Sequence, residues 1–342
     1  MPAIRDRGAA IRTFIVANVE KHPADIVRRA SEKFACSRQA IHKHIHRLVE
    51  EGALVESGQT RSKTYALAEL LSWEKNYADF AALDESRAWL EDVRGQLEPL
   101  ASNVMGIWQY GFTEMFNNAL DHAGATYIHV TVKKTAAASQ VVISDDGVGI
   151  FRKIKQAMGL IDERHAVLEL AKGKFTTDPS RHSGEGIFFS SRMFDDFSII
   201  SGNVFFSHLA QAPEDWILET SNAPGTVVTM ELNNHTSRSA NTVFKKFTSG
   251  DSMGFTKTVV PVRLAQYGDD NLVSRSQARR LITRFERFKT VVLDFKGVKM
   301  IGQAFADEVF RVFRLAHPEV ELIALNPTME VQGMIAHVMQ SS

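Results

Sequence analysis

The sequence has little cysteine, no excess charge of either sign and no long apolar run, and each of these features excludes some classes of protein. Its 342 residues include one cysteine, Cys36, which excludes a disulfide framework and a zinc site built from several cysteines. Lysine plus arginine and aspartate plus glutamate number 40 each, so only a local basic surface is left to bind nucleic acid. No run of ~18 apolar residues occurs, and the start MPAIRDRGAAIR has no apolar secretory core. We therefore expect a cytoplasmic protein that does not bind a membrane.

The length predicts two or three domains, since a domain takes roughly 100 to 200 residues. Changes in pattern divide the chain into a first block over 1–70, a charged helical linker over 71–99, a second block over 100–235 and a last block over 250–342. Helical and strand patterns occur in all three blocks, so the expected fold class is a multidomain α/β (α+β) protein.

The first block reads as three helices followed by a hairpin. Apolar periodicity predicts helices over 11–20, 24–35 and 37–52, the last opened by Ser37 as its N-cap. Two short β runs over 53–68 surround a polar, basic tip. This order resembles a winged helix-turn-helix, which implies that the third helix enters the DNA major groove while the wing contacts phosphate.

The third helix and the wing carry the polar side chains that such a role needs. The candidate DNA-binding residues are Arg38, Gln39, His42, Lys43, His46, Arg47, Arg61 and Lys63. Two alternatives stay open. The module can use the same fold to bind protein, or Cys36, His42 and His46 can be metal ligands that lack an evident fourth partner.

The stretch EMFNNALDHAG, residues 114 to 124, stacks polar groups on one face of a predicted helix. Glu114, Asn118 and His122 recur every four residues, with Asp121 beside them. Such a stripe is costly to bury without partners, so it predicts a solvated face, a satisfied polar network or a site for something charged.

Three more motifs follow in order. A strand pattern ends in D-x-G-x-G at Asp145, Gly147 and Gly149; a G-x-G at Gly184 and Gly186 opens an apolar helix; and a strand pattern begins GTVV at Gly225-Thr226. Over 100–235 this order resembles the GHKL ATPase domain of DNA gyrase, the heat-shock chaperone, MutL, histidine kinases and anti-sigma-factor kinases. The resemblance implies an α/β sandwich that binds ATP and Mg²⁺, with Asp121, His122 and Thr226 in the nucleotide site.

The residue types suit those roles. Magnesium prefers oxygen ligands, so the Asn118 amide together with phosphates and water suffices. Glu114 is the candidate catalytic base that orients or deprotonates a water, and Asp145 can accept a hydrogen bond from the adenine amine. Gly147 and Gly149 would let the backbone approach the base.

Phosphate contacts are expected from two further segments. The turn at Gly184 and Gly186 presents backbone N–H groups at a helix N-terminus. The irregular, polar segment 152–183 resembles the ATP lid, in which Lys174 with Thr176 or Thr177 is the candidate γ-phosphate contact; its charges can equally be solvated.

The last block alternates strands and helices and predicts a small α/β layer domain. The run VVLDFKGVKMIGQAFADEVFRVF resembles the STAS domain of anti-anti-sigma factors, and more closely a STAS-like relative of unknown function. Where phosphorylated STAS proteins have a serine, positions 302–304 are Gly, Gln and Ala, so phosphorylation there is not expected.

Together the blocks predict a DNA-binding regulator in which the ATP lid closes on nucleotide. We expect duplex DNA as a partner, a protein partner for the STAS-like domain, and a homodimer. Two alternatives remain: a serine/threonine kinase of the anti-sigma type, and an ATPase of DNA repair or defence.

Overall fold

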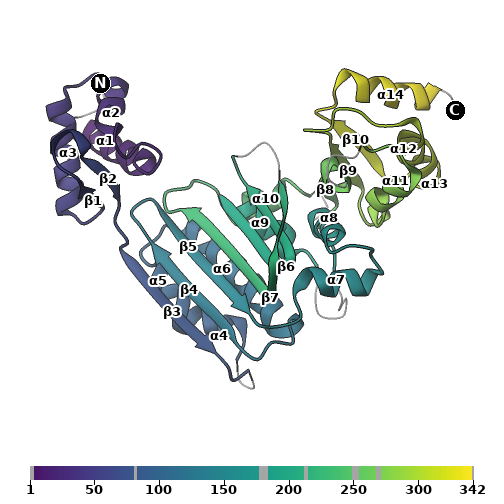
Figure 1. Ribbon diagram of the computed structural model, residues 1–342, viewed down its shortest axis with the longest axis horizontal. Coiled ribbons are helices and arrows are strands. Elements are labelled where there is room, and N and C mark those ends of the chain that lie inside the picture. The colour runs from purple at the N-terminus through teal and green to yellow at the C-terminus, as the bar shows by residue number, and fades with distance from the viewer. Residues whose placement is uncertain are drawn as a thin grey trace.

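The computed structural model describes residues 4–80, 83–176, 184–211, 215–248, 254–266 and 271–340. Three units follow one another along its long axis: a small N-terminal unit, a central domain built on a sheet, and a C-terminal domain (Figure 1). No helix in these ranges combines the length and the apolar character that crossing a bilayer requires.

The N-terminal unit has the predicted three helices and hairpin. The helices are α1 (Ile4–Asn18), α2 (Ile26–Phe34) and α3 (Arg38–Glu50), and the hairpin pairs β1 (Leu54–Ser57) with β2 (Thr64–Leu67). The Ser37 hydroxyl accepts a hydrogen bond from the Ala40 N–H at 3.2 Å, which caps α3 as expected. The unit has its own apolar core, in which Ile15, Ile41 and Ile45 are buried.

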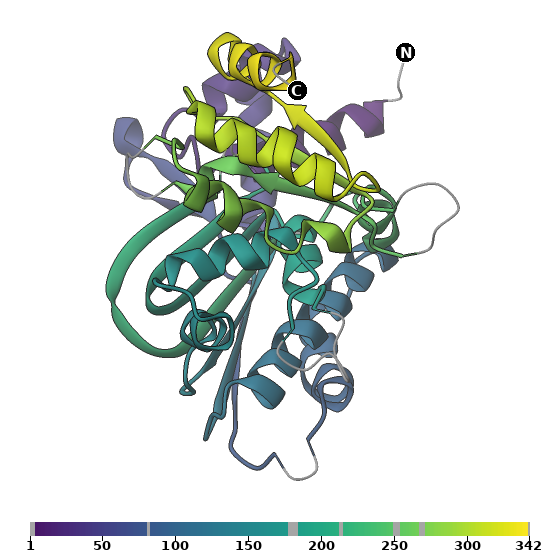
Figure 2. The same ribbon diagram turned by 90° about the vertical axis from the view of Figure 1, so that its right-hand side faces the viewer.

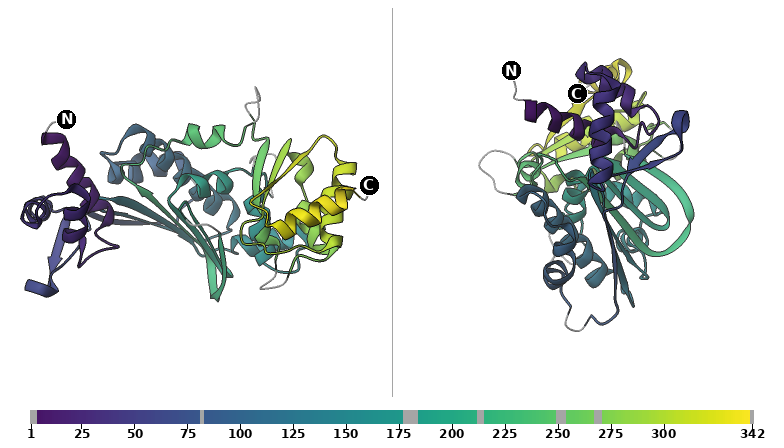
Figure 3. Two further views of the ribbon diagram at one scale, coloured as in Figure 1. Left: turned by 90° about the horizontal axis from the view of Figure 1, so that it is seen from above. Right: turned by 90° about the vertical axis from the view of Figure 1, so that its left-hand side faces the viewer.

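The central domain is a five-stranded antiparallel sheet in the order β3-β4-β5-β7-β6. Its strands are β3 (Leu71–Tyr77), β4 (Ile128–Lys134), β5 (Ala138–Asp145), β6 (Asp196–Leu209) and β7 (Trp216–Asn233). One face is covered by helices α4 (Glu85–Ala88), α5 (Arg94–Leu97), α6 (Ser102–Asn117) and α9 (Gly186–Met193) (Figures 1 and 3). Along β4 the buried Ile128, Val130 and Val132 alternate with more exposed residues, as a strand with one covered face requires.

The prediction of a helical linker over 71–99 was wrong for its first part. Residues 71–77 form β3, the edge strand, because Trp73 and Tyr77 face the core at strand spacing and Trp73 lies opposite Val132 of β4. The Tyr77 hydroxyl donates to Asp92 Oδ2 at 2.9 Å and ties this strand to the helical part that follows. The central domain therefore begins at Leu71, not at residue 100.

The prediction that 152–183 is irregular was also wrong over most of its described part. The segment contains α7 (Ile150–Met158) and α8 (Arg164–Lys172), and Gly159 ends α7 with a φ of +61°. Every residue of α8 from His165 to Lys172 is buried, because α8 packs against α7 and α9 of the central domain and also against β8 of the C-terminal domain.

The C-terminal domain has the predicted alternation of strands and helices. Three parallel strands in the order β10-β9-β8 carry helices between them. Its elements are β8 (Lys257–Pro261), α11 (Arg275–Ile282), β9 (Thr290–Asp294), α12 (Gln303–Asp307), α13 (Arg314–Ala316), β10 (Glu321–Leu325) and α14 (Met329–Gln340). A short helix, α10 (Ala240–Lys245), precedes the domain and packs against α9 and α6.

The central and C-terminal domains share one continuous core, and in Figure 2 the C-terminal domain lies directly over the helices of the central one. Phe255, just before β8, packs on Phe188 of α9 and on Phe288 before β9, with ring centroids 4.5 and 5.3 Å apart. Arg192 of α9 is partly buried, lies over the Phe188 ring, and donates to Phe188 O at 3.0 Å and Val259 O at 3.4 Å. Burial lowers the pKa of Arg192 to about 10.

Candidate functional site

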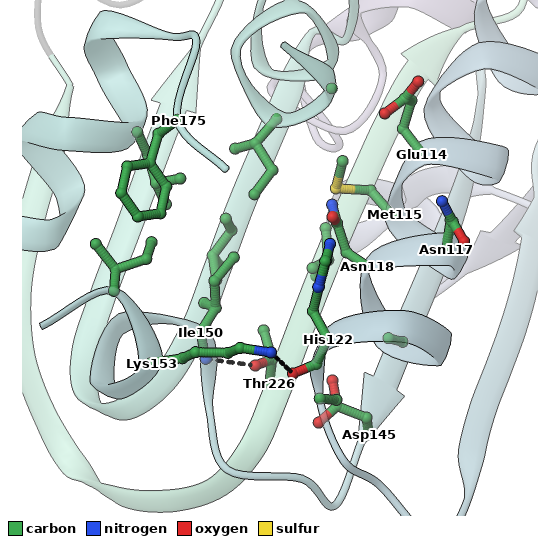
Figure 4. Close-up of a pocket in the computed structure, with 18 of the residues that line it drawn as sticks. Glu114, Met115, Asn117, Asn118, His122, Asp145, Ile150, Lys153, Phe175 and Thr226 are labelled. Atoms are coloured by element: carbon green, nitrogen blue, oxygen red, sulfur yellow. Dashed lines mark hydrogen bonds between the residues drawn. The ribbon is translucent and has the colours of Figure 1, made fainter. Parts of the chain in front are cut away.

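A cavity of about 330 Å³ lies where α6, β5, α7 and α9 converge, within the size range of small-molecule sites. Figure 4 shows Glu114 at one end and Asp145 at the other, with Asn118 and His122 between them. All four residues line the cavity. The cavity thus brings together four residues that the sequence analysis assigned to one site, and their roles there stay predictions.

Glu114 lies in the last turn of α6, against the first residue of α9. A Cβ atom added at Gly186 would overlap the Glu114 carboxylate, so glycine at 186 is what lets the two helices meet here. The N-terminus of a helix favours anions through its free N–H groups and dipole. Glu114 thus stands at the end of the cavity best suited to phosphate, which Gly184 and Gly186 also line.

Asn118 and His122 belong to a π-helical segment, Asn118–His122, that extends α6. They line the cavity together with Asn117, which the sequence analysis did not single out. Asp121 is exposed and is not among the lining residues, so the structure separates it from the other three.

Asp145 ends β5 and is 8% exposed. Its Oδ1 accepts a hydrogen bond from the Gly147 N–H at 2.9 Å. Burial raises the pKa of this carboxyl, although hydrogen bonds from the Gly147 and Thr226 N–H groups partly oppose that rise. Thr226 also lines the cavity, and its hydroxyl accepts from the Ile150 N–H at 3.1 Å, which joins β7 to the start of α7.

The two glycines after Asp145 are required by the chain itself. A Cβ at Gly147 would overlap the Ala123 carbonyl, and one at Gly149, where φ is +92°, would lie 2.7 Å from Ser201 Oγ. Gly149 lines the cavity and Gly147 does not. Room for a bound base is therefore not the immediate reason for Gly147.

Lys153 of α7 is a site residue that the sequence analysis missed. Its Nζ donates to the His122 carbonyl at 2.6 Å, across the cavity (Figure 4). Among the described residues that line the cavity it is the one lysine or arginine. Lys153 follows Ile150, another lining residue, by three positions, but the spacing alone did not mark this lysine out from the others in the segment.

The candidate γ-phosphate contacts of the expected lid lie in different surroundings. Thr176 lines the cavity, next to Phe175. Lys174 is not a lining residue; its Nζ donates to the Arg287 carbonyl at 2.8 Å and lies 4.8 Å from the Phe288 ring centroid. Contact of Lys174 with phosphate would require this bond to break and stays a prediction. Thr177 lies outside the described residues.

The candidate DNA-binding residues form a second surface, on α3 and distant from the cavity (Figure 1). Those of α3 are all exposed: Arg38, Gln39, His42, Lys43, His46 and Arg47. Arg47 pairs with Glu51 at 2.7 Å, and Lys63 on the hairpin pairs with Glu56 at 2.7 Å. The side chain of Arg61 lies outside the described part.

No group of three His, Cys, Asp or Glu side chains able to hold a metal occurs among the described residues, which include Cys36, His42 and His46. A divalent cation at the cavity would therefore need phosphate oxygens as ligands. Asn118, with an amide oxygen, and Glu114, with a carboxylate, are the lining groups that fit such a cation. The N-terminus of α9, which begins at Gly186, fits a phosphate.

Two family models match the chain. Residues 77–204 match a histidine kinase-like ATPase domain, and residues 277–332 match a STAS-like domain of unknown function. No curated protein matches the chain. The match over 77–204 contains the α6 stripe, the D-x-G-x-G turn and the Gly184–Gly186 turn, which confirms the family assignment made from those motifs.

Proposed function

We propose that this chain, which carries a histidine kinase-like ATPase domain followed by a STAS-like domain, is a DNA-binding regulator controlled by ATP. In this proposal the central domain binds ATP with Mg²⁺, and closure of the 152–183 segment on the nucleotide alters binding of DNA or of a protein partner. The two family matches support the nucleotide-binding part. The exposed basic face of α3 supports the DNA-binding part.

At the cavity, each lining group has a role that its chemistry suits. Asp145 accepts from the adenine amine, while Ile143, Ile150 and Ile154 supply apolar walls for the base. Asn118 provides an oxygen ligand for magnesium, which when bound neutralises phosphate charge. Glu114 holds and deprotonates the attacking water at the phosphate end.

Lys153 adds a positive charge to a cavity that otherwise has Glu114 and Asp145 as its charged lining groups. A nucleotide triphosphate brings several negative charges, so a cation among these walls offsets part of their repulsion. We assign Lys153 to nucleotide binding for this reason.

The observation that carries the DNA-binding proposal is the surface of α3. Six exposed polar positions on one helix, three of them Arg or Lys, suit a helix that lies in a major groove. A homodimer would present two such helices to paired half-sites. The STAS-like domain, in turn, is the candidate surface for a protein partner.

One incubation separates this proposal from the two alternatives. The protein is supplied with γ-labelled ATP in the presence and absence of duplex DNA and of candidate protein partners. Nucleotide-dependent retention on DNA with little labelled product supports the regulator. Transfer of label to protein contradicts it in favour of a serine/threonine kinase, and DNA-stimulated phosphate release in favour of a DNA-repair or defence ATPase.

A further inference from the structure

A buried cluster of charges joins α8 of the ATPase domain to the STAS-like domain. Glu169 lies between two cations: its Oε1 is 2.7 Å from Lys172 Nζ and its Oε2 is 3.0 Å from Arg284 Nη1. The side chains are 4%, 0% and 8% exposed for Glu169, Lys172 and Arg284. Glu169 and Lys172 belong to α8, whereas Arg284 comes from the chain between α11 and β9.

The cluster is compensated by hydrogen bonds, as buried ions must be. Lys172 Nζ also donates to the carbonyls of Arg280 at 2.9 Å and Thr283 at 3.1 Å, both in the STAS-like domain. Burial lowers the pKa of Lys172 to about 8. Arg284 Nη2 donates to the carbonyl of Gly173, the residue that ends α8.

This contact reaches the wall of the cavity within two residues. The Arg284 guanidinium lies 5.1 Å from the ring centroid of Phe175, and Phe175 lines the cavity. Between them, Lys174 and Arg287 exchange hydrogen bonds: Lys174 Nζ donates to Arg287 O at 2.8 Å and Arg287 Nη1 donates to Lys174 O at 3.1 Å. The STAS-like domain therefore hydrogen-bonds to the backbone of 173–174 and contacts the ring of Phe175.

The backbone conformation of residues 173–174 requires stabilisation by contacts from outside the segment. Gly173 has a φ of +79° and Lys174 a φ of +53°, and a left-handed lysine is less stable than an extended one unless its surroundings fix it. Arg284 itself has a φ of +68°. Lys174 and Arg284, two non-glycine residues with left-handed backbones, thus lie on opposite sides of one interface. Hydrogen bonds across this interface stabilise both segments.

We infer that Arg284 of the STAS-like domain is a positioning residue for the nucleotide site, because it fixes Gly173 and Phe175 and so sets how long a bound nucleotide is retained. The inference rests on the proposed nucleotide-binding function and goes beyond it by giving the STAS-like domain a role within its own chain. Arg284 acts through Phe175 and the backbone of 173–174, without touching the nucleotide.

The test measures release of a fluorescent ATP analogue from the full chain and from Arg284→Ala and Arg284→Lys. We expect the analogue to dissociate about ten-fold faster from Arg284→Ala, the effect of losing one charge-assisted hydrogen bond. Millimolar guanidinium should slow release again, whereas methylammonium should not. Arg314→Ala, which removes an exposed arginine of the same domain, should release the analogue like the parent.

Amide hydrogen exchange of 173–176 without nucleotide gives a second readout. Faster exchange confined to this stretch in both Arg284 variants supports the positioning role of Arg284. If the parent binds no nucleotide, the proposed function fails, but this exchange result still tests whether Arg284 fixes residues 173–176. If Arg284→Ala does not fold, Arg284→Lys and Arg284→Met, which leaves Glu169 paired with Lys172, carry the test. Unchanged release and exchange in the folded variants, or a loss spread over the whole domain that guanidinium does not restore, would overturn the inference.

Discussion

The carboxylate of Glu114 lies against Gly186, so closely that any side chain at 186 would overlap it. Glu114 is the first residue of the polar stripe and Gly186 is the first residue of α9, and they are 72 positions apart in the chain, the difference between 186 and 114. Their contact places a carboxylate at the N-terminus of a helix, where a phosphate would also be favoured. The contact thus gives Glu114 a position from which it can act on a phosphate bound there.

Removing the Glu114 carboxylate should stop hydrolysis without stopping binding. We expect Glu114→Ala to retain ATP while phosphate release falls by ~10²-fold or more, the usual worth of a positioned general base. Equilibrium binding of an ATP analogue and steady-state phosphate release are the two measurements. Glu114→Gln, which keeps the shape and removes the charge, serves as the matched variant and should behave in the same way. Loss of binding together with hydrolysis in both would make Glu114 a structural residue.

Asp145→Asn should weaken nucleotide binding and change its pH dependence. Burial raises the pKa of Asp145 above the ordinary value of 3.8, so its ionised form is lost at a higher pH than for an exposed aspartate. ATP affinity of the parent should therefore fall as the pH is lowered through that raised pKa. The asparagine variant should bind more weakly at neutral pH and lack this part of the pH dependence. Parallel affinity curves for parent and variant would contradict the assignment to adenine.

Asn118→Ala should remove the response of nucleotide binding to magnesium. The amide oxygen of Asn118 is the neutral oxygen ligand offered by the α6 stripe, and alanine offers none. ATP affinity is measured for parent and variant over a magnesium titration, with Asp121→Ala as the control because Asp121 does not line the cavity. A parent whose affinity does not depend on magnesium would count against the role of Asn118.

Removing three charges from α3 should abolish retention on duplex DNA. The variant changes Arg38, Lys43 and Arg47 to Ala; affinity for DNA should be lost and ATP binding kept. Parent affinity should fall as salt rises, since phosphate contacts release counterions. A control with the same change in net charge replaces three exposed residues elsewhere, Arg87, Arg94 and Lys245, and should bind DNA like the parent. DNA binding by the α3 variant would move this unit to protein recognition.

The motifs of the site were predictable because each is local. Glu114, Asn118 and His122 share one helical face, and Asp145 follows directly from the end of a strand pattern. Helical spacing also places Lys153 with Ile150, but a single lysine in an amphipathic helix gives no separate signal. Asp121 was assigned by proximity in sequence, although it turns away from the cavity.

The errors arose where tertiary contacts decide. Residues 71–77 hold two charges among seven residues and become a strand because β4 supplies hydrogen-bond partners. The α8 helix is buried on all sides only because a domain 85 residues or more downstream covers it, as the difference between Lys172 and Lys257 indicates. The position of the Lys174 side chain is likewise set by the C-terminal domain, to which it hydrogen-bonds. Its bond to Arg287 cannot be read from the polar sequence around it.

The account's central claim is that the nucleotide at the cavity sets the affinity for DNA, and a DNA titration under three nucleotide conditions tests it most directly. The parent is titrated with duplex DNA at fixed salt in ATP, in ADP and without nucleotide, beside Lys174→Ala. We expect the parent to show a 5- to 150-fold difference in DNA affinity between ATP and ADP, the usual range of about 1 to 3 kcal/mol for coupled sites. Lys174→Ala should bind both nucleotides yet show no such difference. Equal DNA affinity of the parent in all three conditions would contradict the claim.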